Sequence, residues 1–256
     1  MYFWNPHKSI IMNRYTVIYK STLAMLIVFL LFAFTGNLIN TPKNIVKREI
    51  VSVVKSDMDT KIETVYSALQ TNQFELPNQV CFGEALKGFY ALKEKGIVKS
   101  NILTLVDFSL SSNVKRLWII DLSSNMVILQ TLVAHGRNTG EEFANNFSNR
   151  SESFKSSLGF YVTGEVYKGK HGISLKLDGL EKGLNDNARN RAVVLHGADY
   201  VSESFIKNHK RLGRSQGCPA VPVKFASEII TMIKGQSCLY IYHPSINNSK
   251  QNHLVS

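Results

Sequence analysis

The chain has 256 residues, of which 44% are hydrophobic and 19% charged, and its formal net charge is +11 at pH 7. This composition is typical of a globular protein and excludes a largely disordered chain. The basic residues are scattered, with no zinc-finger spacing, no aromatic RNA-binding box and no basic helix followed by heptads, so we expect no nucleic-acid partner. The charge instead suits an anionic polymer or a membrane surface.

Residues 1–36 have the layout of an export signal. Basic residues between His7 and Lys20 precede an uncharged run whose centre, residues 23–34, is almost purely apolar. This centre is short for a membrane span, which takes about 20 residues, and no persuasive cleavage site follows it. A cleaved signal peptide and a retained N-terminal membrane anchor therefore both stay open. In either case the basic flank predicts that the rest of the chain is exported to the periplasm or cell envelope.

Residues 37–100 are expected to form a stalk followed by a small helical region. Apolar residues at helical spacing predict a helix over residues 59–69. Asn78 follows a break at Leu76-Pro77 and is placed to cap a second helix, which Gly96 ends. The predicted buried stripe of this second helix comprises Val80, Ala85, Leu86, Phe89, Tyr90 and Leu92.

Residues 101–245 read as one domain that is mainly β with some α (α+β), and residues 246–256 as a polar tail. Two β-rich runs flank the turn signal Ser123-Ser124-Asn125, and a second hairpin is expected around Lys168-Gly169. A short apolar strand over residues 192–195 ends on His196-Gly197. The other expected elements are a first strand over residues 102–108, a helix over residues 222–233 and a last strand over residues 239–242.

The three cysteines differ in their surroundings. An odd number in an exported chain leaves at least one thiol unpaired. Cys81 and Cys238 read as small buried hydrophobic residues, although a disulfide between them stays open. Cys218 lies among Gly, Ser, Gln and Pro, which predicts a loop position.

Cys218 and His196 together suggest nucleophilic catalysis. A thiol is a strong nucleophile only as the thiolate, and a nearby imidazole can take its proton. Gly217 lets the backbone turn tightly, so that amide N–H groups can converge on a developing oxyanion.

Zinc binding is the rival reading, because Cys and His both ligate zinc. It would require His196, His209, Cys218 and His135 to converge, without any C-x-x-C or close pair of histidines. We therefore predict neither a metal nor another cofactor.

The motifs LHG and SQGC, at His196 and Cys218, resemble the signature of the L,D-transpeptidase catalytic domain, most closely the murein L,D-transpeptidase subgroup. The segments that carry the resemblance are KSSLGFYVTGEVYKGKHGISLKLDGLE, GLNDNARNRAVVLHGADYVSE and GRSQGCPAVP. The resemblance covers about residues 102–244, with a looser match from Ser67.

The resemblance implies a mixed β-sandwich, preceded here by the small helical region, that transfers acyl groups between peptide stems of peptidoglycan through a Cys218 thioester. It implies that His196 is the base, that the amides of Gly217 and Cys218 form the oxyanion hole, and that Gly197 belongs to the substrate site. Ser215 either contacts the substrate or hydrogen-bonds the backbone of the turn. A backbone carbonyl commonly orients the histidine in this family, and the sequence does not identify it.

Two positions depart from the wider family. Gln216 stands where that family has histidine, so it can donate a hydrogen bond but cannot carry a proton. Ala220 stands where Arg or Asn is usual, so one structural or substrate-carboxylate contact must come from another residue. Arg214 is the candidate for that contact, with Arg211 beside it, although a solvated loop charge is the alternative. His135 could line the same cleft as a second imidazole or be a structural histidine.

Three functions remain open at this level. The acyl-enzyme is resolved by an amine in a transpeptidase and by water in an L,D-carboxypeptidase. An inactive wall-binding module that kept the fold is the third reading, which the departures at Gln216 and Ala220 favour and the presence of both Cys218 and His196 opposes.

Overall fold

The computed structural model describes residues 56–248, which belong to one compact unit. The predicted export signal and the start of the predicted stalk lie outside the described residues, as does most of the predicted tail. No helix within residues 56–248 is long and apolar enough to cross a membrane.

The two N-terminal helices begin where polar caps predict. Helix α2 (Asp57–Ser67) starts after Ser56, and α3 (Gln79–Glu94) starts after Asn78, whose side chain accepts from the N–H groups of Val80 and Cys81. The predicted buried stripe of α3 differs from the structure at two positions, because Val80 is 59% exposed and Tyr90 is only partly buried, whereas Cys81 and Phe82 are buried.

Eight strands form one sheet in the order β3-β2-β1-β8-β4-β5-β6-β7. They are β1 (Ile102–Asp107), β2 (Leu117–Asp121), β3 (Met126–Thr131), β4 (Gly159–Gly169), β5 (Gly172–Gly179), β6 (Val194–Ala198), β7 (Ala220–Pro222) and β8 (Cys238–Tyr242). The pairs β1/β8 and β6/β7 are parallel, and the other neighbours are antiparallel.

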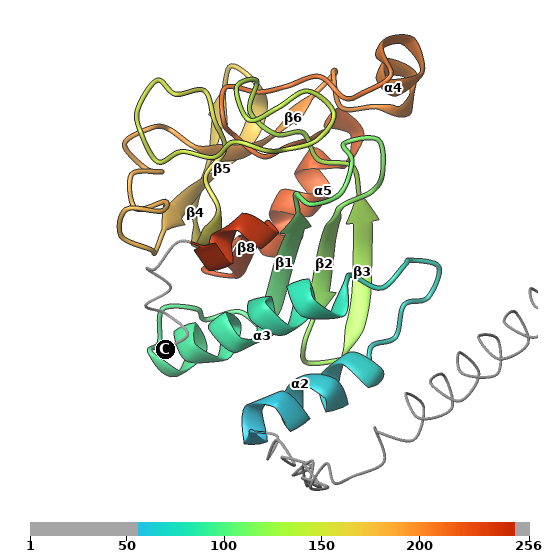
Figure 1. Cartoon of the computed structure of the whole chain (residues 1–256), viewed down its shortest axis with the longest axis vertical. Coiled ribbons are helices and arrows are strands. Elements are labelled where there is room, and N and C mark those ends of the chain that lie inside the picture. The colour runs from blue at the N-terminus through green and yellow to red at the C-terminus, as the bar shows by residue number, and fades with distance from the viewer. Residues whose placement is uncertain (1–55, 249–256) are drawn as a thin grey trace, which may run out of the picture. The chain divides into compact units, whose positions relative to one another are not determined.

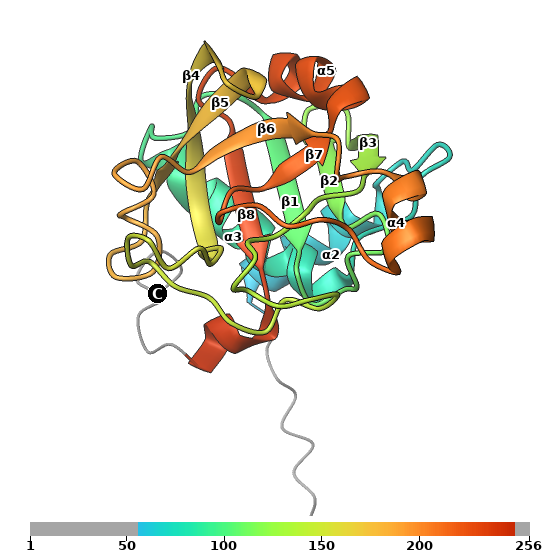
Figure 2. The ribbon, with the colours of Figure 1, turned by 90° about the horizontal axis from the view of Figure 1, so that it is seen from above.

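The sheet curls until its two ends meet. The segment after β3 pairs with β7 through the bridge Ala134–Ala220, with an N–H···O distance between the heavy atoms of 2.8 Å. Seen from above, β6 and β7 cross over β8, β1 and β2 (Figure 2). Helix α5 (Val223–Ile233) packs between these parts, in contact with β1 and with β5, β6 and β7. The mixed α+β architecture inferred from the family resemblance is therefore confirmed.

Helix α3 covers the other side of the strands, in contact with β1 and β8 (Figure 1). Its buried residues belong to the same hydrophobic core as those of the sheet and of α5. The predicted helical region thus shares its core with the β domain.

Several local predictions need correction. The second hairpin turns at Lys170-His171, not at Lys168-Gly169, because β4 continues through Gly169 and Gly172 takes the positive φ of 77°. His196 and Gly197 lie inside β6, not after it. Helix α4 (Glu203–His209) and strand β7 were not predicted, and a 3₁₀ turn (Pro244–Asn248) follows β8.

Candidate active site

Cys218 ends a tight turn that leads directly into β7. The hydroxyl of Ser215 holds this turn: it accepts from the N–H of Gly217 at 3.0 Å and donates to the carbonyl of Cys218 at 2.6 Å. Gly217 has φ of +122°, and a Cβ there would lie 2.8 Å from the carbonyl oxygen of Lys155. A side chain at position 217 is therefore excluded by both backbone conformation and space.

A second His-Gly pair, His135-Gly136, packs against this turn. The carbonyl of His135 accepts from the N–H of Ser215 at 3.0 Å, and a Cβ on Gly136 would lie 2.9 Å from the Cα of Gly217. The hydroxyl of Ser156 bridges the two glycines, accepting from the Gly136 N–H at 3.0 Å and donating to the Gly217 carbonyl at 3.2 Å.

The His135 ring is buried and does not line the cavity that holds Cys218. Its Nδ1 accepts from the guanidinium of Arg116 at 2.8 Å, so Nε2 carries the proton, and this N–H donates to the Gly140 carbonyl at 3.2 Å. Burial and the charge of Arg116 lower its pKa to about 4. The geometry thus favours the structural alternative for this histidine.

His196 lies on β6, beside the strand that follows Cys218. In the parallel β6/β7 pairing, His196 is opposite Ala220. Its Nδ1 lies 2.9 Å from the carbonyl oxygen of Gly197. Since a carbonyl only accepts, Nδ1 carries the proton in the neutral ring, and Nε2 is left with a free lone pair. Gly197 also lets α5 approach closely, because a Cβ there would lie 2.9 Å from that of Ala226.

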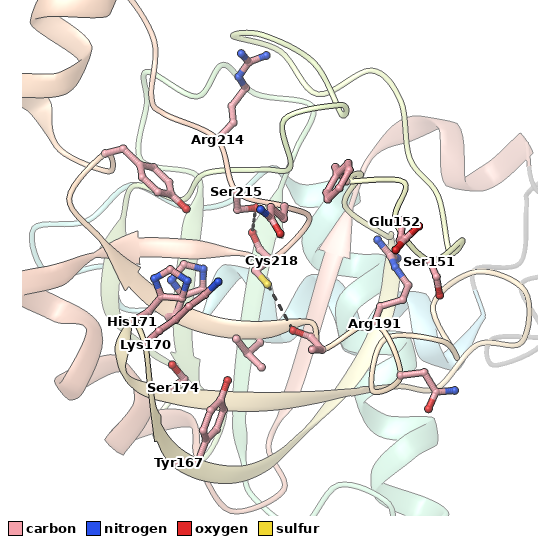
Figure 3. Close-up of a pocket in the computed structure, with 17 residues that line it drawn as sticks. Ser151, Glu152, Tyr167, Lys170, His171, Ser174, Arg191, Arg214, Ser215 and Cys218 are labelled. Carbon is pink, nitrogen blue, oxygen red and sulfur yellow. Dashed lines mark hydrogen bonds between the residues drawn. The ribbon is translucent and has the colours of Figure 1, made fainter.

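Cys218 and His196 line one cavity of about 740 Å³ (Figure 3). Ser215, Gln216 and Arg214 also line it, whereas Gly217 and Gly197 contribute to its frame and not to its lining. Its other walls come from the β4–β5 hairpin, from residues 151–154 and from residues 190–194. Glu152 is the one acidic residue among the described residues that line it.

Burial disfavours the charged forms of both central groups. It raises the pKa of the Cys218 thiol, an effect opposed by the backbone N–H of Val194 and by the positive charges of Arg191 and Lys170. It lowers the pKa of His196, with smaller contributions in the same direction from His171 and Lys170 and an opposing one from the Gly197 carbonyl. The thiol donates a hydrogen bond to the carbonyl of Ala192 at 3.8 Å.

The side chain of Arg214 is bonded to other residues of the chain and does not point toward Cys218. Its guanidinium points away from Cys218 (Figure 3) and bonds the carboxylate of Glu141 at 2.5 Å and the carbonyl of Gly140 at 3.2 Å. Arg211 pairs with the same carboxylate at 2.9 Å. Glu141 therefore already balances the charge of the residue expected to bind a substrate carboxylate.

Sequence reasoning missed three basic residues of the cavity. Lys170 and His171 form the tip of the β4–β5 hairpin and lie on one side of Cys218, and Arg191 lies on the other (Figure 3). The basic pair in a turn dipeptide was the signal available for the first two. Neither Lys170 nor Arg191 forms an ion pair with a carboxylate of the described residues.

The residues of the zinc reading do not come together. His135 faces Arg116, and His209 stacks on Phe205 in α4, with ring centroids 4.0 Å apart. Within residues 56–248 no three His, Cys, Asp or Glu side chains are grouped so that they could hold a metal ion. The three cysteines are free, with Cys81 and Cys238 buried.

Comparison with solved structures finds matches at low sequence identity. The chain is similar to an L,D-transpeptidase from Mycobacterium smegmatis (10% identity, TM-score 0.35, 56% of this chain and 59% of that chain covered). It is also similar to the K307A mutant of the helical cell shape determining protein Pgp2 from Campylobacter jejuni (11%, 0.39, 61% and 54%) and to an L,D-transpeptidase from Stackebrandtia nassauensis (11%, 0.35, 73% and 92%). The chain spans less than two thirds of the first two proteins.

Comparison of sequences identifies the family. No curated protein sequence matches the chain. The family model of the L,D-transpeptidase catalytic domain, however, matches residues 75–242, which is well over half of the chain and includes α3, all eight strands and the whole cavity. The chain therefore belongs to the L,D-transpeptidase catalytic domain family.

Proposed function

We propose that the chain is a cysteine acyltransferase that acts on the peptide stems of peptidoglycan through a Cys218 thioester. The observation that carries the proposal is the presence of Cys218 and His196 in one cavity, with Nδ1 of His196 bonded to the Gly197 carbonyl so that Nε2 is free to accept a proton. Family membership directs the search for the acyl donor to peptidoglycan stems.

The proposed reaction begins when the thiol exchanges its bond to the Ala192 carbonyl for one to His196. The sulfur attacks the carbonyl carbon on the carboxyl side of an L-centred residue, and the thiol proton passes to Nε2. The C–N bond then breaks, and the imidazolium returns the proton to the leaving D-amino acid. An amine of a second stem attacks the thioester, loses a proton to His196 and releases the thiol.

In this mechanism the N–H of Cys218, which is close to the sulfur of the same residue, donates a hydrogen bond to the oxyanion. The N–H of Gly217, the second expected donor, is bonded to the Ser215 hydroxyl in the resting site. Ser215 and Gly217 therefore shape the turn that presents the Cys218 amide, and a second oxyanion donor requires the Ser215 bond to open.

In this proposal Lys170 and Arg191 supply, for a substrate carboxylate, the positive charge that was expected from Arg214. Both act on the Cys218 thiol electrostatically, and both lack a carboxylate partner among residues 56–248. A substrate carboxylate beside the sulfur would find compensating positive charge there. Gln216 lines the same wall and is a neutral hydrogen-bonding contact.

The test is the intact mass of the purified chain after incubation with a tetrapeptide-stem muropeptide, for the wild type, Cys218→Ala and His196→Ala. An acyl adduct or a released D-amino acid, lost in both variants, supports the mechanism. Cross-linked dimers identify an amine acceptor, and tripeptides identify water and hence the carboxypeptidase. Neither adduct nor product, with folded wild-type protein, would favour the wall-binding module.

We also propose that the chain works outside the cytoplasm, on the basis of the basic and apolar sequence in residues 1–36. Fractionation of cells that express the full chain, followed by N-terminal sequencing, tests this. A chain in the envelope that starts near residue 37 indicates cleavage, one that starts at Met1 indicates an anchor, and a cytoplasmic chain refutes the proposal.

A further inference from the structure

The tip of the β4–β5 hairpin contacts His196, the general base in the proposed reaction. Gly169 pairs with Gly172, so the turn between the strands consists of Lys170 and His171 alone. Both residues line the cavity that holds Cys218 and His196. The hairpin base is tied to the chain before β6, because Arg189 bonds Asp178 of β5 and Glu165 of β4.

The ring of His171 stacks on the ring of His196. Their centroids are 4.4 Å apart and their planes differ by 24°. The Gly197 carbonyl fixes one edge of the His196 ring at Nδ1, but a single hydrogen bond leaves the ring free to tilt about it. The stacked imidazole covers one face and opposes that tilt.

We propose that His171 is a positioning residue for His196, which keeps the plane of the base fixed so that Nε2 stays available to the Cys218 thiol. This inference rests on the proposed acyl transfer. His171 itself need not exchange a proton with the substrate, and stacking, not titration, is its essential property.

The stack also has an electrostatic consequence. His171 and Lys170 both lower the pKa of His196, in the same direction as burial. The other titratable groups that line the cavity around them are Cys218, Arg191, Arg214, Tyr167, Tyr200 and Glu152. Removing His171 opens one face of the ring to water and removes a repulsive charge, and both changes raise the pKa of His196.

Three variants test whether stacking on His196 is the property of His171 that matters. His171→Ala removes the stack, and His171→Phe keeps a flat ring without a titrating group. His209→Ala is the matched control, because His209 also stacks on an aromatic ring, Phe205, but lies on α4 outside the cavity. D-amino acid release is measured against pH, and the tautomer and titration of His196 are followed by nitrogen NMR in the substrate-free full chain.

We expect His171→Ala to lower kcat about tenfold with little change in KM, because the base is less often aligned. Its acidic limb moves to higher pH, and the NMR titration of His196 moves the same way. His171→Phe restores most of kcat, and His209→Ala behaves as the wild type.

Equal loss in His171→Ala and His171→Phe would overturn the inference, because the imidazole would then react itself. A change in KM alone would make His171 a substrate contact, and an unchanged His196 titration in His171→Ala would show that the rings do not interact. If the wild type released no product, the proposed function would fail, while the NMR comparison would still decide whether His171 holds the His196 ring.

Discussion

Burial acts on the two central residues of the cavity in opposite directions. It raises the pKa of the Cys218 thiol and lowers that of the His196 imidazole. Both shifts disfavour a thiolate–imidazolium pair before substrate binds. In the proposed reaction, the proton therefore leaves the sulfur as attack begins, and Lys170 and Arg191 reduce the cost of the charge on the thiolate.

This resting state predicts how Cys218 reacts with iodoacetamide. Because its pKa is raised, the thiolate fraction grows only as the pH rises above neutrality, so the alkylation rate should increase through the alkaline range. Lys170→Met should move the profile to still higher pH, because it removes a charge that lowers the pKa. Cys218→Ser is the control and should stay unlabelled, since Cys81 and Cys238 are buried. A rate that is flat from acidic pH upward would indicate a preformed ion pair.

The turn before Cys218 supports a second prediction at the scale of single residues. Gly217→Ala should lower kcat/KM by about 100-fold or more, because the clash with the Lys155 carbonyl forces the turn that carries Cys218 to shift. Gly235→Ala is the matched control: its φ is also positive, at +89°, but no atom lies within 4 Å of the added Cβ.

Gly235→Ala should therefore cost only about 1–2 kcal/mol of unfolding free energy and leave turnover unchanged. Kinetics and denaturant unfolding of both variants check the pair. Similar turnover in the two would show that space at position 217 is not critical.

Among the larger elements, the loop over residues 148–157 is bridged at several points by the side chain of Arg191. The guanidinium of Arg191 donates to the carbonyls of Ser148 at 2.8 Å and Lys155 at 2.6 Å, and to the Ser157 hydroxyl at 2.5 Å. Residues 151–154 of this loop form a wall of the cavity. A planar fork with several fixed donors is needed to bridge these acceptors.

Arg191→Lys should therefore loosen the loop while keeping the charge. We expect faster amide hydrogen exchange over residues 148–157 and a loss of about 1–3 kcal/mol in unfolding free energy, as for hydrogen bonds to a charged donor. Arg189→Lys is the control, because Arg189 is more exposed and pairs with Asp178 and Glu165 away from this loop. It should change stability by less than about 1 kcal/mol and leave exchange in the loop as it is. Equal exchange in both variants would contradict the assignment.

The same scale shows where sequence reasoning succeeds. The β2–β3 hairpin and α3 were predicted because their signals are local: a turn at Asn125 with φ of 51°, and a cap at Asn78. Strand β7 has only three residues and exists because β6 and Ala134 pair with it across the fold. No local pattern indicates such a strand.

The cavity follows the same division. Cys218 and His196 were identified because their chemistry stands out in their own segments. His171 reaches the cavity because the register of the hairpin places Ser174 opposite His196. Arg191 is held at the cavity by a loop that is distant in sequence and contains Lys155. Arg214 was assigned from its nearness in sequence to Cys218, which does not reveal that Glu141 is its partner.

In the whole molecule, the helical region and the β domain depend on one core. Phe82 and Leu86 of α3 are fully buried in the cluster that contains the strands of the sheet. Gly88 allows α3 to approach β4 closely, because a Cβ there would lie 2.0 Å from the ring of Phe160 in β4. That ring in turn stacks on Tyr240 of β8, with centroids 4.1 Å apart. A change on α3 is therefore transmitted to the centre of the sheet.

Gly88→Ala should test this dependence. Alanine favours a helix over glycine by about 1 kcal/mol, but the displaced Phe160 ring should outweigh that gain, with a net loss of about 2 kcal/mol typical of overpacking. Gly83→Ala is the matched control in the same helix: its added Cβ would meet only a methyl group of Ile62, at 3.3 Å, so it should be neutral or stabilising. Thermal unfolding of both should show a single transition, since one core is shared. Two separate transitions, or a Gly88→Ala variant as stable as Gly83→Ala, would mean that α3 is not part of the cooperative unit that holds the cavity.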